Sequence, residues 1–72
     1  DVRLADRLLE LAQDDVVKAT HQALGTELGT AREVVSRTLA EFQRRGWIEQ
    51  ARGMIRLLSR PDLEKLAQST GG

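Results

Sequence analysis

The fold is decided by residues 20–45, which read THQALGTELGTAREVVSRTLAEFQRR. Leu24 and Leu28 stand four residues apart, the spacing of neighbours on one helix face. Thr20 precedes them and is a favoured N-cap residue. Gly29 follows them and ends the helix, because glycine adopts the left-handed backbone conformation at little cost. The first part of the stretch is therefore predicted to be a short helix that starts after Thr20.

A second and longer helix is predicted over residues 31–45. Thr30 and Glu33 match a capping box, with Thr30 at the N-cap and Glu33 three residues later, and Gly46 closes the helix. Two helices joined by a tight glycine-containing turn are the signature of a helix-turn-helix. Gly25 interrupts the first helix at a cost of about 1 kcal/mol relative to alanine, which we expect where another helix packs very close.

The flanking segments supply further elements. Apolar residues recur at helical spacing over residues 1–13, and residues 16–19 are a short β-branched apolar run typical of a strand. Apolar runs on both sides of Gly53 predict a β-hairpin over residues 47–58, and Pro61 marks the start of a last helix. The predicted order is helix, short strand, helix, turn, helix, hairpin, helix. The predicted fold class is mainly α with a small β-hairpin.

The length and composition restrict the function. A chain of 72 residues is one small domain, and it contains no cysteine, which excludes disulfides, thiolate metal sites and cysteine nucleophiles. No apolar run is long enough to span a membrane. The net charge is zero, but residues 1–15 hold two arginines and five acidic side chains, whereas residues 29–56 hold six arginines and three glutamates. The basic half of the chain therefore begins with the second helix of the motif.

The second helix has two different faces when its residues are sorted at about 100° per residue. The side expected to pack on the core consists of Ala31, Val34, Val35, Thr38, Leu39 and Phe42. The opposite side consists of Arg32, Glu33, Ser36, Arg37, Ala40, Gln43 and Arg44. A slender polar face that carries arginines fits the major groove of DNA, where an arginine binds guanine with two hydrogen bonds and a glutamate accepts one from cytosine.

Each of these residues also has a simpler interpretation. Arg32 and Arg37 are equally compatible with ordinary solvated surface positions, and Glu33 with the capping box alone. Arg52 at the hairpin tip either contacts phosphate or is ordinary turn polarity. His21 is the only histidine, so it cannot build a metal site or a catalytic triad, and we expect it at a helix N-terminus near phosphate.

Residues 20–39, together with 46–48 and 52–55, resemble the C-terminal winged helix-turn-helix domain of the cyclic-AMP receptor protein and fumarate–nitrate reductase regulator (Crp/Fnr) family. The spacing of Arg32-Glu33 and Ser36-Arg37 behind Gly29 is the most specific part. The resemblance implies one winged helix-turn-helix domain over residues 1–72, with a three-helix core, a wing and a C-terminal helix. It also implies a fragment of a longer bacterial transcription regulator.

The resemblance further assigns roles to individual positions. The expected base-reading residues, for a site of the TGTGA or TTGA type, are Arg32, Glu33, Ser36 and Arg37. The resemblance implies DNA-backbone contacts at Thr20, Gln22 and Arg52, and we expect further backbone contacts at His21, Thr30 and Arg44. Such regulators act in the bacterial cytoplasm on the nucleoid, as homodimers formed through a segment outside this chain, with RNA polymerase as a further candidate partner. No cofactor is expected in this chain, and any effector would bind an N-terminal domain outside it.

Two other classes of function, a protein-docking module and an enzyme, agree less well with the sequence than DNA binding does. A winged helix also serves as a protein–protein docking module without DNA binding, and a net charge of zero permits this. An enzyme is not expected, because the chain has no cysteine, no tyrosine and a single histidine, and is too short for a deep cleft.

Overall fold

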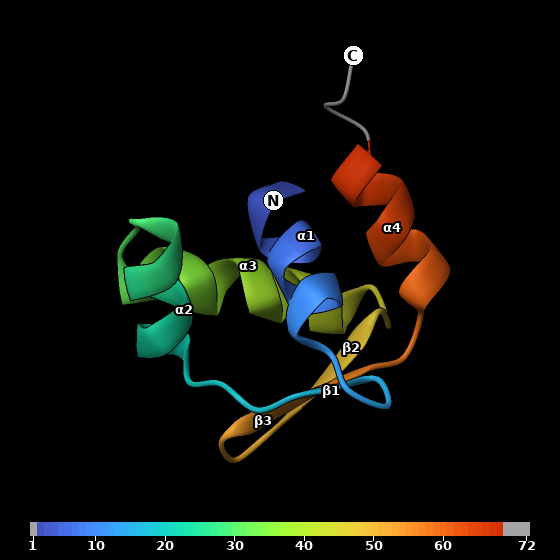
Figure 1. Ribbon diagram of the computed structural model, residues 1–72, viewed down its shortest axis with the longest axis horizontal. Coiled ribbons are helices and arrows are strands. Elements are labelled where there is room, and N and C mark those ends of the chain that lie inside the picture. The colour runs from blue at the N-terminus through green and yellow to red at the C-terminus, as the bar shows by residue number, and fades with distance from the viewer. Residues whose placement is uncertain (1, 69–72) are drawn as a thin grey trace.

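The computed structural model describes residues 2–68, and the elements occur in the predicted order (Figure 1). The helices and strands are α1 (Val2–Leu11), β1 (Val16–Val17), α2 (His21–Leu28), α3 (Arg32–Arg44), β2 (Ile48–Ala51), β3 (Met54–Leu57) and α4 (Arg60–Gln68). The hairpin formed by β2 and β3 is the wing. Asp1, which the sequence placed in the first helix, lies outside the described residues. The fold is that of a winged helix-turn-helix, as predicted.

A single apolar core joins all seven elements. Its buried residues are Leu4, Ala5, Leu8, Val17, Leu24, Val35, Leu39, Phe42, Ile48, Ile55, Leu57 and Leu63. Within residues 2–68 no polar or charged side chain is buried. Since every element contributes to this one cluster, the position of α3 relative to the wing is set by apolar packing.

The turn between α2 and α3 is a Schellman motif. Gly29 has φ 68°, the Gly29 N–H donates to the Thr26 carbonyl at 3.3 Å, and the Thr30 N–H donates to the Gly25 carbonyl at 2.8 Å. A Cβ on Gly25 would lie 2.8 Å from the Thr30 carbonyl oxygen. The predicted close approach at Gly25 is therefore confirmed. Its neighbour is the backbone that leads into α3.

The predicted capping box at the start of α3 is wrong. Ala31 is the N-cap of this helix and makes no side-chain cap hydrogen bond. Thr30 belongs to the Schellman turn, because its N–H is bonded back to Gly25, and the helix therefore begins one residue later than expected. Glu33 therefore does not take part in a capping box, which was the alternative to its predicted role in reading a base. At α2 the expected cap is confirmed, because the Thr20 hydroxyl accepts from the Ala23 N–H at 3.0 Å.

The wing is part of a three-stranded antiparallel sheet in the order β1-β3-β2. Val17 of β1 pairs with Ile55 of β3, and Gln50 of β2 pairs with Ile55 on the other side. The strand at 16–19 was expected, although it is shorter than predicted and its pairing with β3 was not foreseen. In Figure 1 the sheet lies along the lower edge of the molecule, below the helices.

Candidate nucleic-acid interface

The outer face of α3 carries charged side chains that have no internal partner. Arg32, Glu33 and Arg37 are exposed, and none of their side chains forms a hydrogen bond or ion pair with another residue in the range 2–68. The opposite face is held by Val35 and Leu39, whose side chains are buried in the core. The helix therefore presents unpaired charge on a firmly anchored backbone.

The apolar face of α3 is shorter than predicted. Val34 is 41% exposed and Ala31 is also exposed, so the expectation that both pack on the core is wrong. Gly25 approaches the backbone of the turn and of Arg32, so α2 meets the start of α3 through main-chain atoms. The side chains of Ala31 and Val34 therefore remain in solvent, whereas Val35 is buried.

The beginnings of α2 and α3 enclose a surface hollow of about 340 Å³. Its lining residues are Thr20, His21, Gln22, Arg32 and Ser36. The hollow brings together two residues predicted to read bases and three predicted to contact the DNA backbone, although the two groups are more than nine residues apart in sequence.

His21 is engaged on both sides of its ring. Nδ1 lies 2.7 Å from the Ser36 hydroxyl oxygen, and Nε2 lies 2.7 Å from Oε1 of Gln50 in the wing. The predicted phosphate contact of His21 is therefore left to its backbone N–H, which is in the first turn of α2. Gln50 was missed by sequence reasoning, because only the register of the sheet brings it to a residue 29 positions earlier.

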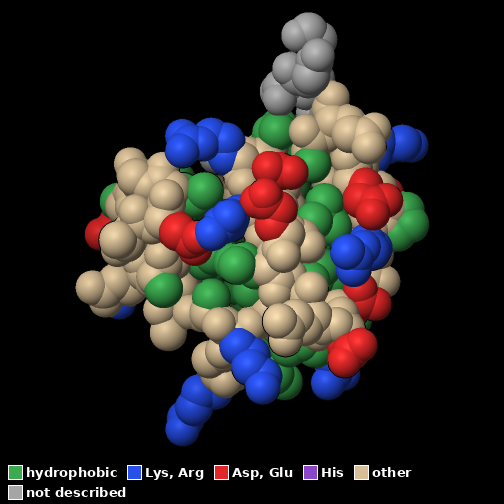
Figure 2. Space-filling model, in the orientation of Figure 1, with side chains coloured by type: hydrophobic (Ala, Val, Ile, Leu, Met, Phe, Trp, Pro, Cys, Tyr) green, Lys and Arg blue, Asp and Glu red, His purple; other side chains and the backbone are tan. Residues whose placement is uncertain are grey.

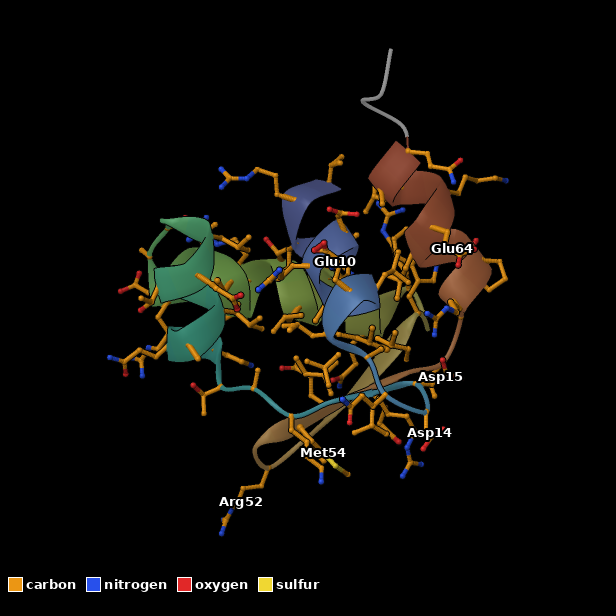
Figure 3. All side chains as sticks on the ribbon, in the orientation of Figure 1. Glu10, Asp14, Asp15, Arg52, Met54 and Glu64 are labelled. Atoms are coloured by element: carbon orange, nitrogen blue, oxygen red, sulfur yellow. The ribbon has the colours of Figure 1, made fainter. Side chains whose placement is uncertain are left out.

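The tip of the wing carries an arginine. Arg52 is exposed beside Gly53, which has φ 71°, and Figure 3 shows its side chain pointing away from the body of the molecule. Arg56 is different, because it lies 3.6 Å from the Glu49 carboxylate across the hairpin. Of the two, Arg52 is therefore the one whose charge is available to a ligand.

The end of α3 holds its cations in a local network. Glu41 pairs with Arg44 and also with Arg45, whose Nε donates to Glu41 Oε2 at 2.8 Å. The hydrogen bond from Arg45 is the main cause that lowers the pKa of Glu41. Arg45 also lies 5.1 Å from the centre of the Trp47 ring. Arg44, a predicted backbone contact, is thus already partly neutralised, although its side chain is 76% exposed.

The face formed by α1 and α4 has a different charge pattern. Two of its arginines are paired: Arg7 with Glu10 and Glu27, and Arg60 with Asp15 and Glu64. Figure 2 shows this face towards the viewer, with red and blue side chains close together. In contrast, the unpaired arginines Arg32, Arg37 and Arg52 lie on α3 and at the wing tip.

Neither a metal cluster nor a membrane-spanning helix accompanies this interface. Residues 2–68 contain no group of three or more histidine, cysteine or acidic side chains placed to hold a metal ion. No helix in that range is both long and apolar enough to cross a membrane.

Comparison with known proteins identifies the family. The family model for the Crp-like helix-turn-helix domain matches residues 2–66. The transcriptional regulator SdrP of Thermus thermophilus is 37% identical over 78 residues, which cover 96% of this chain and 39% of that protein. The chain thus spans about two fifths of the length of that relative.

Solved structures agree with this assignment. A Crp/Fnr-family transcriptional regulator from Thermus thermophilus superposes with a TM-score of 0.85 at 37% identity, covering 93% of this chain and 39% of its own. A putative regulator of the same family from Eubacterium rectale gives a TM-score of 0.88 at 37% identity, covering 93% and 32% of the two chains. The chain therefore belongs to the Crp-like helix-turn-helix domain family of Crp/Fnr transcriptional regulators.

Proposed function

We propose that this chain binds double-stranded DNA sequence-specifically, with α3 in the major groove of one half of a palindromic promoter site. The observation that carries the proposal is the outer face of α3, where Arg32, Glu33 and Arg37 are exposed without partners among residues 2–68. A major groove about 12 Å wide admits one helix, and side chains that are not already paired can reach base edges without first breaking an internal contact.

The base contacts follow from the chemistry of these groups. Arg32 and Arg37 each offer the planar fork that binds guanine O6 and N7, and such a contact discriminates by about 1–3 kcal/mol. Glu33 accepts from the amino group of cytosine. Since Glu33 caps nothing in α3, its carboxylate is free to do so.

The backbone contacts come from the hollow and from the wing. The Thr20 hydroxyl accepts from Ala23 and keeps its own proton to donate to a phosphate oxygen. The N–H groups of His21 and Gln22 lie in the first turn of α2, where a helix attracts anions. Arg52 reaches the backbone from the tip of the wing, with Thr30 and Arg44 as further contacts.

Two copies are needed for a palindromic site. Half-sites one helical turn apart place the two α3 helices about 34 Å apart. We propose that pairing occurs through residues outside this chain, that an effector would bind there as well, and that RNA polymerase is a further partner of the complete regulator. One chain on one half-site is then expected to bind weakly, because it lacks the gain from a second linked site.

Selection from a random duplex library, followed by titration of the selected duplex at several salt concentrations, tests the proposal. We expect one enriched half-site, and an affinity that falls with a slope of about 0.9 per phosphate contact on logarithmic axes. A library without enrichment would contradict sequence-specific binding. An affinity that does not change with salt would contradict DNA binding altogether and favour a protein-docking module.

A further inference from the structure

His21 links three elements of the proposed interface. It begins α2, its Nδ1 contacts Ser36 in α3, and its Nε2 contacts Gln50 in β2, both at 2.7 Å. The Gln50 backbone N–H also donates to Oε1 of Gln43 in α3, at 3.2 Å. The wing is therefore attached to the helix-turn-helix by two polar contacts that meet at Gln50, one with His21 of α2 and one with Gln43 of α3.

The contact with Gln50 determines which nitrogen of the ring carries the proton. The Gln50 atom that faces Nε2 is the amide oxygen, which only accepts hydrogen bonds. A neutral ring that keeps this contact carries its hydrogen on Nε2 and donates it to Gln50. In a neutral imidazole the other nitrogen, Nδ1, then holds a lone pair and accepts.

This tautomer determines the orientation of the Ser36 hydroxyl. Because Nδ1 accepts, the only hydroxyl hydrogen of Ser36 is donated to His21. Ser36 is half-buried and lines the hollow beside Arg32, on the side from which we expect a duplex to approach. On that side it can offer only lone pairs, and it can bind only a group that donates.

We propose that His21 is a positioning residue that fixes Ser36 as a hydrogen-bond acceptor towards the major groove, so that Ser36 selects a base with an exposed amino group. Such bases are adenine, through N6, and cytosine, through N4; guanine and thymine present acceptors at the corresponding positions. This inference rests on the proposed DNA binding and specifies one base position within it.

The experiment is library selection with the wild-type chain, three test variants and one control variant. Ser36→Ala identifies the duplex position that Ser36 reads, because only that position should lose its preference. At that position the wild type should favour adenine or cytosine roughly 5-fold, as expected for one hydrogen bond. His21→Phe should abolish this preference and retain the preferences at the other positions.

Gln50→Glu tests the polarity of the contact itself. A carboxylate beside Nε2 stabilises the doubly protonated ring, whose Nδ1–H then donates to Ser36. The Ser36 hydroxyl hydrogen is released to point outward, and the preference should change to guanine or thymine. Gln68→Glu is the matched control, since it adds the same charge at the exposed end of α4 and should leave every preference unchanged.

A measurement without DNA separates this inference from the proposed function. The ¹⁵N chemical shifts of the imidazole in the free wild-type chain should show hydrogen on Nε2 and a bare Nδ1. The opposite tautomer would overturn the inference whether or not the chain binds DNA. A wild type that enriches no duplex contradicts the proposed function alone, and the tautomer still decides whether Ser36 is held as described.

The remaining outcomes are equally decisive. If the wild type enriches a half-site, but Ser36→Ala changes no preference, Ser36 reads no base and the inference is wrong. If His21→Phe retains the preference for adenine or cytosine, His21 does not position Ser36. Thermal unfolding of each variant is measured in parallel, and if His21→Phe fails to fold, Gln50→Glu provides the decision.

Discussion

Replacing Gly25 by alanine should weaken the fold, although alanine is the better helix former. The exchange gains about 1 kcal/mol of helix propensity. Against this, the new Cβ would lie 2.8 Å from the Thr30 carbonyl oxygen, 3.4 Å from the Arg32 nitrogen and 3.5 Å from the Ala31 carbonyl carbon. Overpacking of this kind costs about 1–3 kcal/mol. Since the nearest atom is rigid backbone next to the Schellman hydrogen bond, we expect the upper part of this cost, about 2–3 kcal/mol. After the gain in helix propensity is subtracted, the net loss is about 1–2 kcal/mol.

The assay is thermal unfolding followed by circular dichroism. For a domain of this size the loss should lower Tm by roughly 4–16 °C. Thr26→Ala is the control, because it is an exposed change in the same helix that gains propensity without meeting a neighbour, so its Tm should stay or rise slightly. A Gly25→Ala chain as stable as the control would refute the argument that close approach requires glycine here.

Four further predictions concern the charged residues. Arg37→Ala should cost about 1–3 kcal/mol on the selected half-site and relax one base preference, measured by fluorescence anisotropy; an equal loss on scrambled DNA would argue against base reading. Arg52→Ala should weaken all duplexes alike and reduce the salt slope by about 1, whereas a sequence-dependent loss would contradict a phosphate contact. Glu33→Ala should relax one base preference, because its carboxylate is not engaged in capping α3, and unchanged preferences at every position would contradict base reading by Glu33. Arg45 holds the pKa of Glu41 below its usual range, so this ion pair stabilises the fold at neutral pH and stops doing so as the pH falls through the lowered pKa. Glu41→Gln should therefore make the free energy of unfolding depend less on pH in the acid range, as measured by acid unfolding.

The predictable parts of this protein are those set by local sequence. The helix-turn-helix follows from the apolar spacing of α2 and from Gly29, and the wing follows from Gly53 between two apolar runs. Each of these signals lies within a few residues of the structure it specifies. The same is true of the Thr20 cap, which needs only the following turn of helix.

The features that the sequence did not predict depend on contacts between residues distant in sequence, or on which of two neighbouring residues caps a helix. Thr30 suits an N-cap, but the Schellman bond to Gly25 uses its N–H and moves the start of α3 to Arg32. The exposure of Val34 depends on how far α2 covers α3, which helical periodicity does not contain. The contact between His21 and Gln50 depends on sheet register.

The pairing of β1 with β3 has a consequence for biosynthesis. Val17 is made well before its partner Ile55. The α1 helix likewise packs against α4, so these two helices depend on each other although α2, α3 and the wing lie between them in the sequence. A nascent polypeptide leaving the ribosome can form the helical hairpin around Gly29 first, but it cannot close its sheet until residue 57 has emerged. Until then the early apolar segments stay exposed, so stalled translation within the wing would yield a product prone to aggregation and proteolysis.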